Sequence, residues 1–219
     1  MTTIETSPSP TRRRQARATA TRTALLDAAL EEFAAHGFEG ASTRAIAAAA
    51  GTHQPQINYH FESKEELWKA AVDHLFERLD QVVSEQLGDT SPGWDSRDGF
   101  AANVRAFVRA AAGLPELNRI MVQEATIDSE RLQWIVERHT RPRFELVTGR
   151  WRRLREEGRV PDIDEVVLYY SLVGAASLAY VNAPEARLLG HDTLTDRFID
   201  AHADAIVTMF LGPVERVEP

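Results

Sequence analysis

A polar stretch near the N-terminus carries side chains of the type that read base pairs. Gln54 and Gln56 each present a paired hydrogen-bond donor and acceptor, which matches the N6 and N7 groups of adenine in a major groove. Arg44 carries a guanidinium group that suits guanine O6 and N7, or a phosphate. These three residues are therefore candidates for contacts that distinguish one DNA sequence from another.

The neighbouring polar residues fit the phosphate backbone, where contacts set the register of a protein on DNA without reading its sequence. They are Thr43, His53, Tyr59, His60 and Lys64, and Pro55 belongs to the same candidate DNA-binding set. For Tyr59 and His60, packing inside the protein is the alternative. A lost base contact would cost about 1–3 kcal/mol and relax specificity at one position, whereas a lost phosphate contact would weaken binding to all sequences alike.

Two longer helices are predicted on either side of this stretch. Apolar residues recur at helical spacing over 19–36, and Gly37 is placed to end that helix in the left-handed conformation. Ser63 and Glu66 form a capping box, in which the serine caps a helix and the glutamate follows three residues later. A further helix is therefore expected over 64–87.

Between them, two short helices joined by a glycine turn form a predicted helix-turn-helix, a unit whose second helix lies in the major groove. Ala47 is small where the two helices cross, and Gly51 supplies the positive φ of the turn. Ile57 fills the core beneath the second helix. An ordinary helical hairpin is the alternative, but the short helices and the polar outer face of 53–60 argue against it.

The remainder of the chain is again helical by its pattern, and no run of alternating polar and apolar residues predicts a strand. Helices are expected at about 98–113, 115–127, 129–157, 163–181 and 194–211, with a kink at Pro142 in the third of these. The helix at 163–181 is apolar on nearly all sides, so it must be buried on several faces. The chain is therefore predicted to be all-α, with a small three-helix head and a larger helical body.

The composition is that of a folded globular protein of 219 residues, with 43% hydrophobic and 26% charged residues. The net charge of -8 is divided unevenly along the chain, because residues 1–60 carry a charge of +1. Residues 12–22 hold five arginines and no acid. We expect residues 1–18 to form a disordered basic arm that is attracted to phosphate or enters a minor groove; a solvated tail is the alternative.

Several classes of protein are excluded by what the sequence lacks. Without cysteine there is no disulfide, thiolate metal site or cysteine nucleophile. The motifs of serine hydrolases, dinucleotide enzymes, P-loop proteins and zinc proteases are absent, and the histidines lack ligand-spaced partners. There is no signal peptide and no apolar run long enough for a membrane. We therefore expect a cytoplasmic, non-enzymatic protein without metal, cofactor or membrane contact.

Motifs fall in a characteristic order along residues 23–69, about a fifth of the chain. They are Leu26-Asp27-Ala28-Ala29, Phe33, Gly37-Phe38, Ser42-Thr43, Ile46-Ala47, Ala50-Gly51, Tyr59-His60-Phe61 and Ser63-Lys64-Glu65-Glu66-Leu67. In this order they resemble the TetR (tetracycline-repressor-like) family, with the portion from His60 to Leu67 the most specific. One departure is Asn58, where many members carry tyrosine, so either Asn58 or Tyr59 makes the phosphate contact.

The resemblance implies a domain organisation and a mechanism. Residues 19–64 would be the DNA-binding domain and 65–219 a ligand-binding and dimerisation domain. In the family, two bodies pair through their last two long helices, here 163–181 and 194–211, and the homodimer binds a palindromic operator on double-stranded DNA. The chain would be a transcriptional repressor that an unknown small-molecule effector releases by moving the helix at 64–87. A nonspecific, architectural DNA-binding protein is the alternative.

Within the body, large apolar and aromatic side chains are candidates for the lining of an effector cavity. They are Phe107, Met121, Trp134, Phe144, Tyr170 and Leu178, with Glu124 or Arg119 as polar anchors. Packing in an ordinary core is the alternative for each of them. These residue types do not define the chemistry of the effector.

Overall fold

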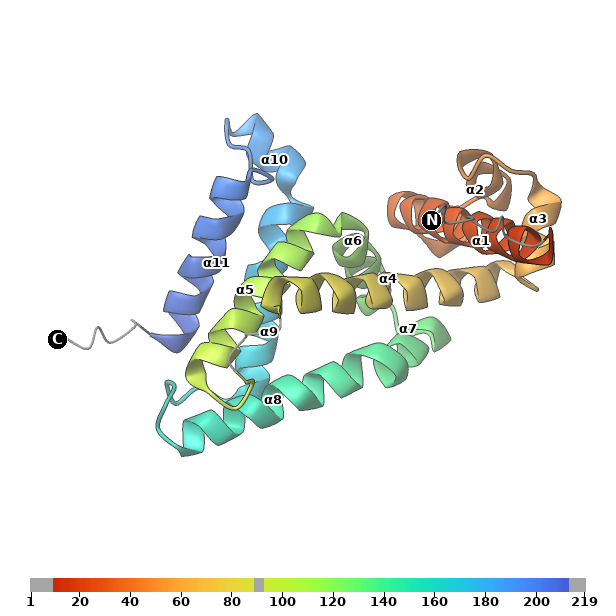
Figure 1. Cartoon of the computed structure of the whole chain (residues 1–219). Helices are drawn as coiled ribbons and strands as arrows, with labels where there is room; N and C mark the ends of the chain where they lie inside the picture. Colours follow the sequence, from red (N-terminus) through yellow and green to blue (C-terminus); the bar gives the residue numbers. More distant parts are fainter. Residues whose placement is uncertain (1–9, 89–92, 213–219) are drawn as a thin grey trace, which may run out of the picture. The chain divides into compact units, whose positions relative to one another are not determined.

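The computed structural model describes residues 10–88 and 93–212. Within these ranges all regular structure is helical, which confirms the predicted all-α fold. None of the helices in these ranges combines the length and the apolarity that crossing a membrane requires. The chain divides after Leu75 into two compact units, a head and a body, which are described separately (Figure 1). The division falls within α4 (Lys64–Leu87), which therefore supplies residues to both units.

The head is built from α1 (Pro10–Gly40), α2 (Thr43–Ala49), α3 (Gln54–His60) and the first half of α4. Gly37 interrupts α1 with a φ of 67°, in agreement with the predicted end of the first helix. Apolar side chains from all four helices form the core of the head, which includes Leu25, Leu30, Phe33, Ile46, Ile57, Leu67 and Trp68. Each buried side chain of this size stabilises the fold by about 1.5–3 kcal/mol, so the core fixes the positions of the short helices.

The first helix begins earlier than the sequence predicted. We expected a disordered arm over residues 1–18, whereas α1 begins at Pro10; residues 1–9 lie outside the described residues. Proline is favourable at the start of a helix, and the residues that follow are mainly alanine, arginine and glutamine, which have high helix propensity. The hydrophobic pattern does not reveal these turns, because they contain no large apolar side chain.

The body consists of the second half of α4 and the helices that follow it. These are α5 (Arg97–Gly113), α6 (Pro115–Ala125), α7 (Glu130–Ile135), η1 (Val136–Thr140), α8 (Arg141–Glu156), α9 (Glu165–Val181), α10 (Ala183–Leu188) and α11 (Asp196–Leu211). α5 packs against both α9 and α11 (Figure 1). The core that these helices form with α8 includes Phe100, Val104, Val108, Trp151, Leu168, Leu172 and Ile206. Every helix predicted for the body is present, and α10 is an addition that the sequence pattern did not indicate.

The predicted kink near Pro142 takes the form of a π-helical turn, η1, between α7 and α8. Proline has no N–H for the helical ladder, and its ring collides with the carbonyl four residues earlier, so the preceding turn widens. η1 carries His139, whose side chain is buried. The backbone carbonyl of His139 accepts a hydrogen bond of 2.9 Å from the guanidinium of Arg143, which stabilises the widened turn.

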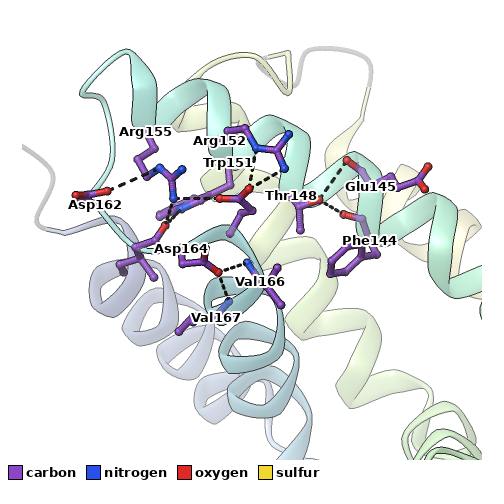
Figure 2. Close-up of polar contacts among 12 residues, drawn as sticks. Phe144, Glu145, Thr148, Trp151, Arg152, Arg155, Asp162, Asp164, Val166 and Val167 are labelled. Carbon is purple, nitrogen blue, oxygen red and sulfur yellow. Dashed lines mark hydrogen bonds and ion pairs between the residues drawn. The ribbon is translucent and has the colours of Figure 1, made fainter.

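A polar network joins the end of α8 to the start of α9 (Figure 2). The indole N–H of Trp151 donates to the carbonyl oxygen of Ile163 at 2.8 Å. Glu165 accepts from Arg152 at 2.7 Å and from Arg155 at 3.0 Å. Its own backbone N–H, followed by these arginines, lowers the pKa of the Glu165 carboxyl from its ordinary value. The network therefore holds the turn between the two helices with an ionised carboxylate at its centre.

Candidate nucleic-acid interface

Ile57 anchors α3 to the head. Its side chain is buried, whereas Gln54, Gln56 and Asn58 are exposed and Tyr59 is 71% exposed. α3 is only seven residues long, so one inward-facing residue is enough to set its orientation. The outer surface of the helix therefore presents to solvent the polar residues that the sequence assigned to DNA.

The turn between α2 and α3 has the geometry of a helix-turn-helix. Ser42 caps α2 by accepting a backbone N–H of the first turn at 3.3 Å, and its own N–H donates to Glu32 at 2.9 Å. Gly51 has a φ of 64°, which glycine adopts without strain. The N–H of Thr52 donates to the carbonyl of Ala47 at 2.9 Å, closing the turn. These bonds leave the start of α3 in a fixed position relative to α2.

The candidates at the N-terminal ends of α2 and α3 lie together. The Nε2 group of Gln54 donates to the Oγ1 of Thr43 at 3.4 Å, which links the two helices side chain to side chain. Arg44, the next residue of α2, is exposed. His53 is the N-cap residue of α3, and Pro55 stands in its first turn; both are exposed. The structure thus brings Thr43 and Gln54 into contact and leaves the adjoining predicted residues, Arg44, His53 and Pro55, exposed.

Lys64 has a structural role that the sequence did not predict. Its Nζ group donates to the backbone carbonyl of Glu39 at 3.2 Å and lies 5.0 Å from the centre of the Phe38 ring. It therefore ties the first turn of α4 to the C-terminal end of α1. A phosphate bound by Lys64 would compete with these contacts.

Arg22 is a neighbour of the interface that the sequence reasoning counted only as part of the basic arm. Its guanidinium lies 5.3 Å from the centre of the Phe61 ring, which directly follows α3. Burial, and then the charge of Arg22, lower the pKa of His60 from its ordinary value, so His60 is neutral at pH 7. A neutral imidazole donates a hydrogen bond but adds no charge. Arg22 therefore contributes a positive charge at this end of α3.

The effector candidates of the body lie in different surroundings. Glu124 is buried and pairs with Arg131 at 3.2 Å, so its charge is already matched within the protein. Trp134 meets the ring of His139 edge-on, with the ring centres 5.4 Å apart. Phe144 meets Tyr169 in the same way at 4.9 Å.

The remaining candidates differ in their exposure. Phe107 packs against the body core, and Met121 is partly exposed. Tyr170 is 69% exposed, and Leu178 is exposed as well. An open groove in the described part of the body includes Leu178 in its lining, together with Gly174, Ala175, Ala179, Asn182, Glu185, Ala186, Leu189, Thr193 and His202. A cavity built from the predicted set thus stays a prediction.

Four residues of the body, the Phe76 cluster, join the second half of α4 to η1 and α8. Phe76 stacks on His139, with ring centres 4.2 Å apart, and the guanidinium of Arg143 lies 4.7 Å from the centre of the same ring. Arg143 also donates to both carboxylate oxygens of Asp80, at 2.7 and 2.6 Å. No sequence pattern marks these contacts, because the residues lie far apart in the chain.

Comparison with known proteins agrees with this arrangement. Residues 25–71 match the family model described as bacterial regulatory proteins, tetR family. A segment of 67 residues is 39% identical to the HTH-type transcriptional repressor AcnR of Corynebacterium glutamicum. That segment spans 31% of this chain and 36% of AcnR, so the likeness to AcnR covers about a third of each protein.

The fold of the whole chain is also shared. AibR, solved in complex with isovaleryl coenzyme A and operator DNA, superposes with a TM-score of 0.66 at 20% identity, over 89% of this chain and 100% of AibR. A TetR family transcription regulator from Marinobacter aquaeolei gives a TM-score of 0.64 at 20% identity, over 90% of this chain and 98% of the other. Residues 25–71 are therefore similar to the tetR family of bacterial regulatory proteins, and about nine tenths of the chain has the fold of these solved structures.

Proposed function

We propose that the protein is a sequence-specific DNA-binding repressor that acts as a homodimer on a palindromic operator and is released by a small ligand. The observation that carries the proposal is the outer face of α3, on which Gln54 and Gln56 are exposed. Both side chains suit adenine, and a helix 10–12 Å across fits a major groove about 12 Å wide. The likeness of the head to the repressor AcnR supports regulation of transcription. A protein with this function would be located in the cytoplasm, where the bacterial chromosome lies.

Apolar side chains that the body leaves in solvent support the pairing of two chains. Val166, Val167, Tyr170 and Leu178 on α9 are exposed, and so is Met209 on α11. Exposed apolar side chains gathered on two neighbouring helices are typical of a protein interface. A two-fold dimer would place its two α3 helices in half-sites about 34 Å apart, and its symmetry is the reason to expect a palindrome.

Release by a ligand requires that a change in the body reach α4. The Phe76 cluster supports this, because Phe76 and Asp80 on α4 contact His139 of η1 and Arg143 of α8. A ligand that favours one arrangement of η1 and α8 would shift the equilibrium position of α4 through these contacts. AibR, which has the same fold, was solved with isovaleryl coenzyme A bound, and this supports the proposal that the present chain also binds a small ligand. Operator DNA would then lower the affinity for the ligand by the same factor as the ligand lowers the affinity for DNA.

Selection of bound DNA from random duplexes tests the reading of sequence. The full chain should recover one palindrome, and Gln54→Ala or Gln56→Ala should weaken binding to it about 5- to 150-fold and relax the preference at one base pair per half-site. Gln133→Ala, which changes an exposed glutamine of the body, is the matched control. Binding that unrelated DNA competes away at moderate salt would identify a nonspecific, architectural protein instead.

Sedimentation of substituted chains tests the dimer. Val167 and Val122 are valines of nearly equal exposure, 59% and 57%, but Val167 lies on α9 and Val122 on α6. Val167→Glu should place a charge in the interface and yield folded monomers that bind the operator weakly, whereas Val122→Glu should remain a dimer. If both variants remain dimers, the interface lies elsewhere.

A further inference from the structure

The first turns of α1 form an exposed basic surface. Arg14 and Arg17 are exposed on the helix, and Arg22 follows on the same element. The sequence from 10 to 26 contains no acidic residue. Arg14 and Arg17 are three residues apart, so they project from neighbouring positions on one side of the helix. The surface defined by Arg14, Arg17 and Arg22 is called the α1 basic row below.

The α1 basic row lies next to the C-terminal end of α3. Arg22 lies over the ring of Phe61 and beside His60, the last residue of α3. From Arg22 to Arg14 the helix advances about 12 Å, because each residue of an α-helix rises 1.5 Å. That distance equals the width of a major groove, about 12 Å. Arg17 lies about 7.5 Å and Arg14 about 12 Å along the helix from Arg22, so both can reach phosphates that border the groove that α3 would occupy.

The helical conformation decides how this segment can meet DNA. A helix with its side chains is about 10–12 Å across, whereas the minor groove is about 6 Å wide. The first turns of α1 are therefore too wide to enter the minor groove as an extended arm would. Their arginines can reach the phosphates that line the groove, for which a guanidinium is well suited.

We propose that Arg14 and Arg17 bind phosphates of the duplex outside the major groove that α3 reads, so that α1 forms a second, sequence-independent DNA contact. The inference rests on the proposed function, since it takes duplex DNA as the ligand. Each phosphate contact releases condensed counterions, and the logarithm of the binding constant falls with the logarithm of salt concentration by about 0.9 per contact. Two contacts in each head add roughly 1.8 to that slope per head.

A charge-removing variant tests the contact. Arg14→Gln/Arg17→Gln in the full chain should weaken binding to the selected operator and to unrelated DNA by similar factors, and should reduce the salt slope by about 1.8 per head. The base preference should not change. Arg153→Gln/Arg159→Gln, which alters two exposed arginines of the body, is the matched control. An unchanged slope would overturn the inference, whereas a wild-type chain that binds no DNA would overturn the proposed function.

A second variant tests the helix itself. Ala16→Pro keeps every arginine but breaks the backbone ladder between Arg12 and Arg17, while Leu25 is the first buried residue in the described part of the head. It should lose as much affinity and as much salt slope as the double variant, and Ala16→Ser should lose neither. The inference fails if Ala16→Pro binds like the wild type and an A·T minor-groove ligand such as netropsin displaces the wild-type segment. Those results would mean that residues 10–18 bind in the minor groove as an extended arm.

Discussion

The imidazole of His139 lies flat against the phenyl ring of Phe76, with ring centres 4.2 Å apart and an interplanar angle of 4°. His139 belongs to the π-helical turn η1, and Phe76 is one of the residues of α4 that lie in the body. The π turn is a consequence of Pro142. This single proline therefore positions the imidazole ring of His139, against which Phe76 of α4 packs.

Phe76→Ala should lower the free energy of unfolding by about 3–5 kcal/mol, because Phe76 is almost fully buried and its removal leaves a cavity. Urea unfolding followed by circular dichroism measures the loss. Phe76→Leu should cost less, since it keeps part of the volume. Glu77→Ala, at the exposed neighbouring position, should change the stability by no more than about 0.5 kcal/mol. Equal losses at both positions would show that Phe76 contributes no specific packing.

The ion pair between Arg143 and Asp80 should contribute little to stability despite its short distances. Asp80 is 66% exposed and Arg143 29% exposed, so water screens the pair, and the coupling energy should be below about 1 kcal/mol. A double-mutant cycle with Arg143→Gln and Asp80→Asn measures it. A coupling energy of several kcal/mol would mean that the pair, and not the stacked rings, is the main attachment of α4.

Gly51→Ala should destabilise the head through the backbone alone. Gly51 has a φ of +64°, and a Cβ atom built there meets nothing within 4 Å. The expected loss is about 1–2 kcal/mol, and Gly51→Asn should lose less because asparagine tolerates this conformation. Gly113→Ala is the control, since Gly113 is equally open but has no positive φ. If thermal unfolding of Gly51→Ala and Gly113→Ala shifts alike, the turn does not require glycine.

His202 should make the body sensitive to acid. Tyr180 and the Nδ1 of His202 are hydrogen-bonded at 2.9 Å, and burial lowers the pKa of His202 from its ordinary 6.5 and raises that of Tyr180 to about 12. Below about pH 6.5 the unfolded chain therefore binds a proton that the folded chain does not, and the stability falls as the pH decreases towards the folded pKa.

Melting temperatures between about pH 7.5 and about pH 5.5 check this effect. His202→Gln removes the group and should lose less stability over that range than the wild type. His60, whose pKa is also lowered, contributes in the same direction, so part of the wild-type loss should remain. His191→Gln, at an exposed histidine, should behave like the wild type. An identical loss in His202→Gln would exclude His202 as the source.

The sequence predicted the helices of the head and the exposed face of α3 because their signals are local. The apolar spacing of α1 and the glycines at 37 and 51 each act within a few residues of their position. Such signals need no knowledge of the tertiary structure. They were sufficient to identify α3 as the element that presents polar side chains.

Other features depend on contacts between distant residues. Lys64 looked like a free cation in the sequence, but its contact with the carbonyl of Glu39 requires the packing of α4 against α1. The Phe76 cluster likewise unites residues more than sixty positions apart. The first turns of α1 were missed for another reason, since helix propensity alone, without apolar residues, is a weak signal.

Within α3, all of whose residues the structure describes, Ile57 alone is buried. Under the proposed function, the residue of α3 that supports folding and the residues that select the DNA target are therefore at different positions of the same short segment. After a gene duplication, changes at Gln54, Gln56 or Asn58 would leave the hydrophobic interior intact and would still pass selection for a folded product. A duplicated copy of the protein could thus come to bind a different promoter through one or two substitutions on the exposed face of α3, while the buried residues of the head remain unchanged.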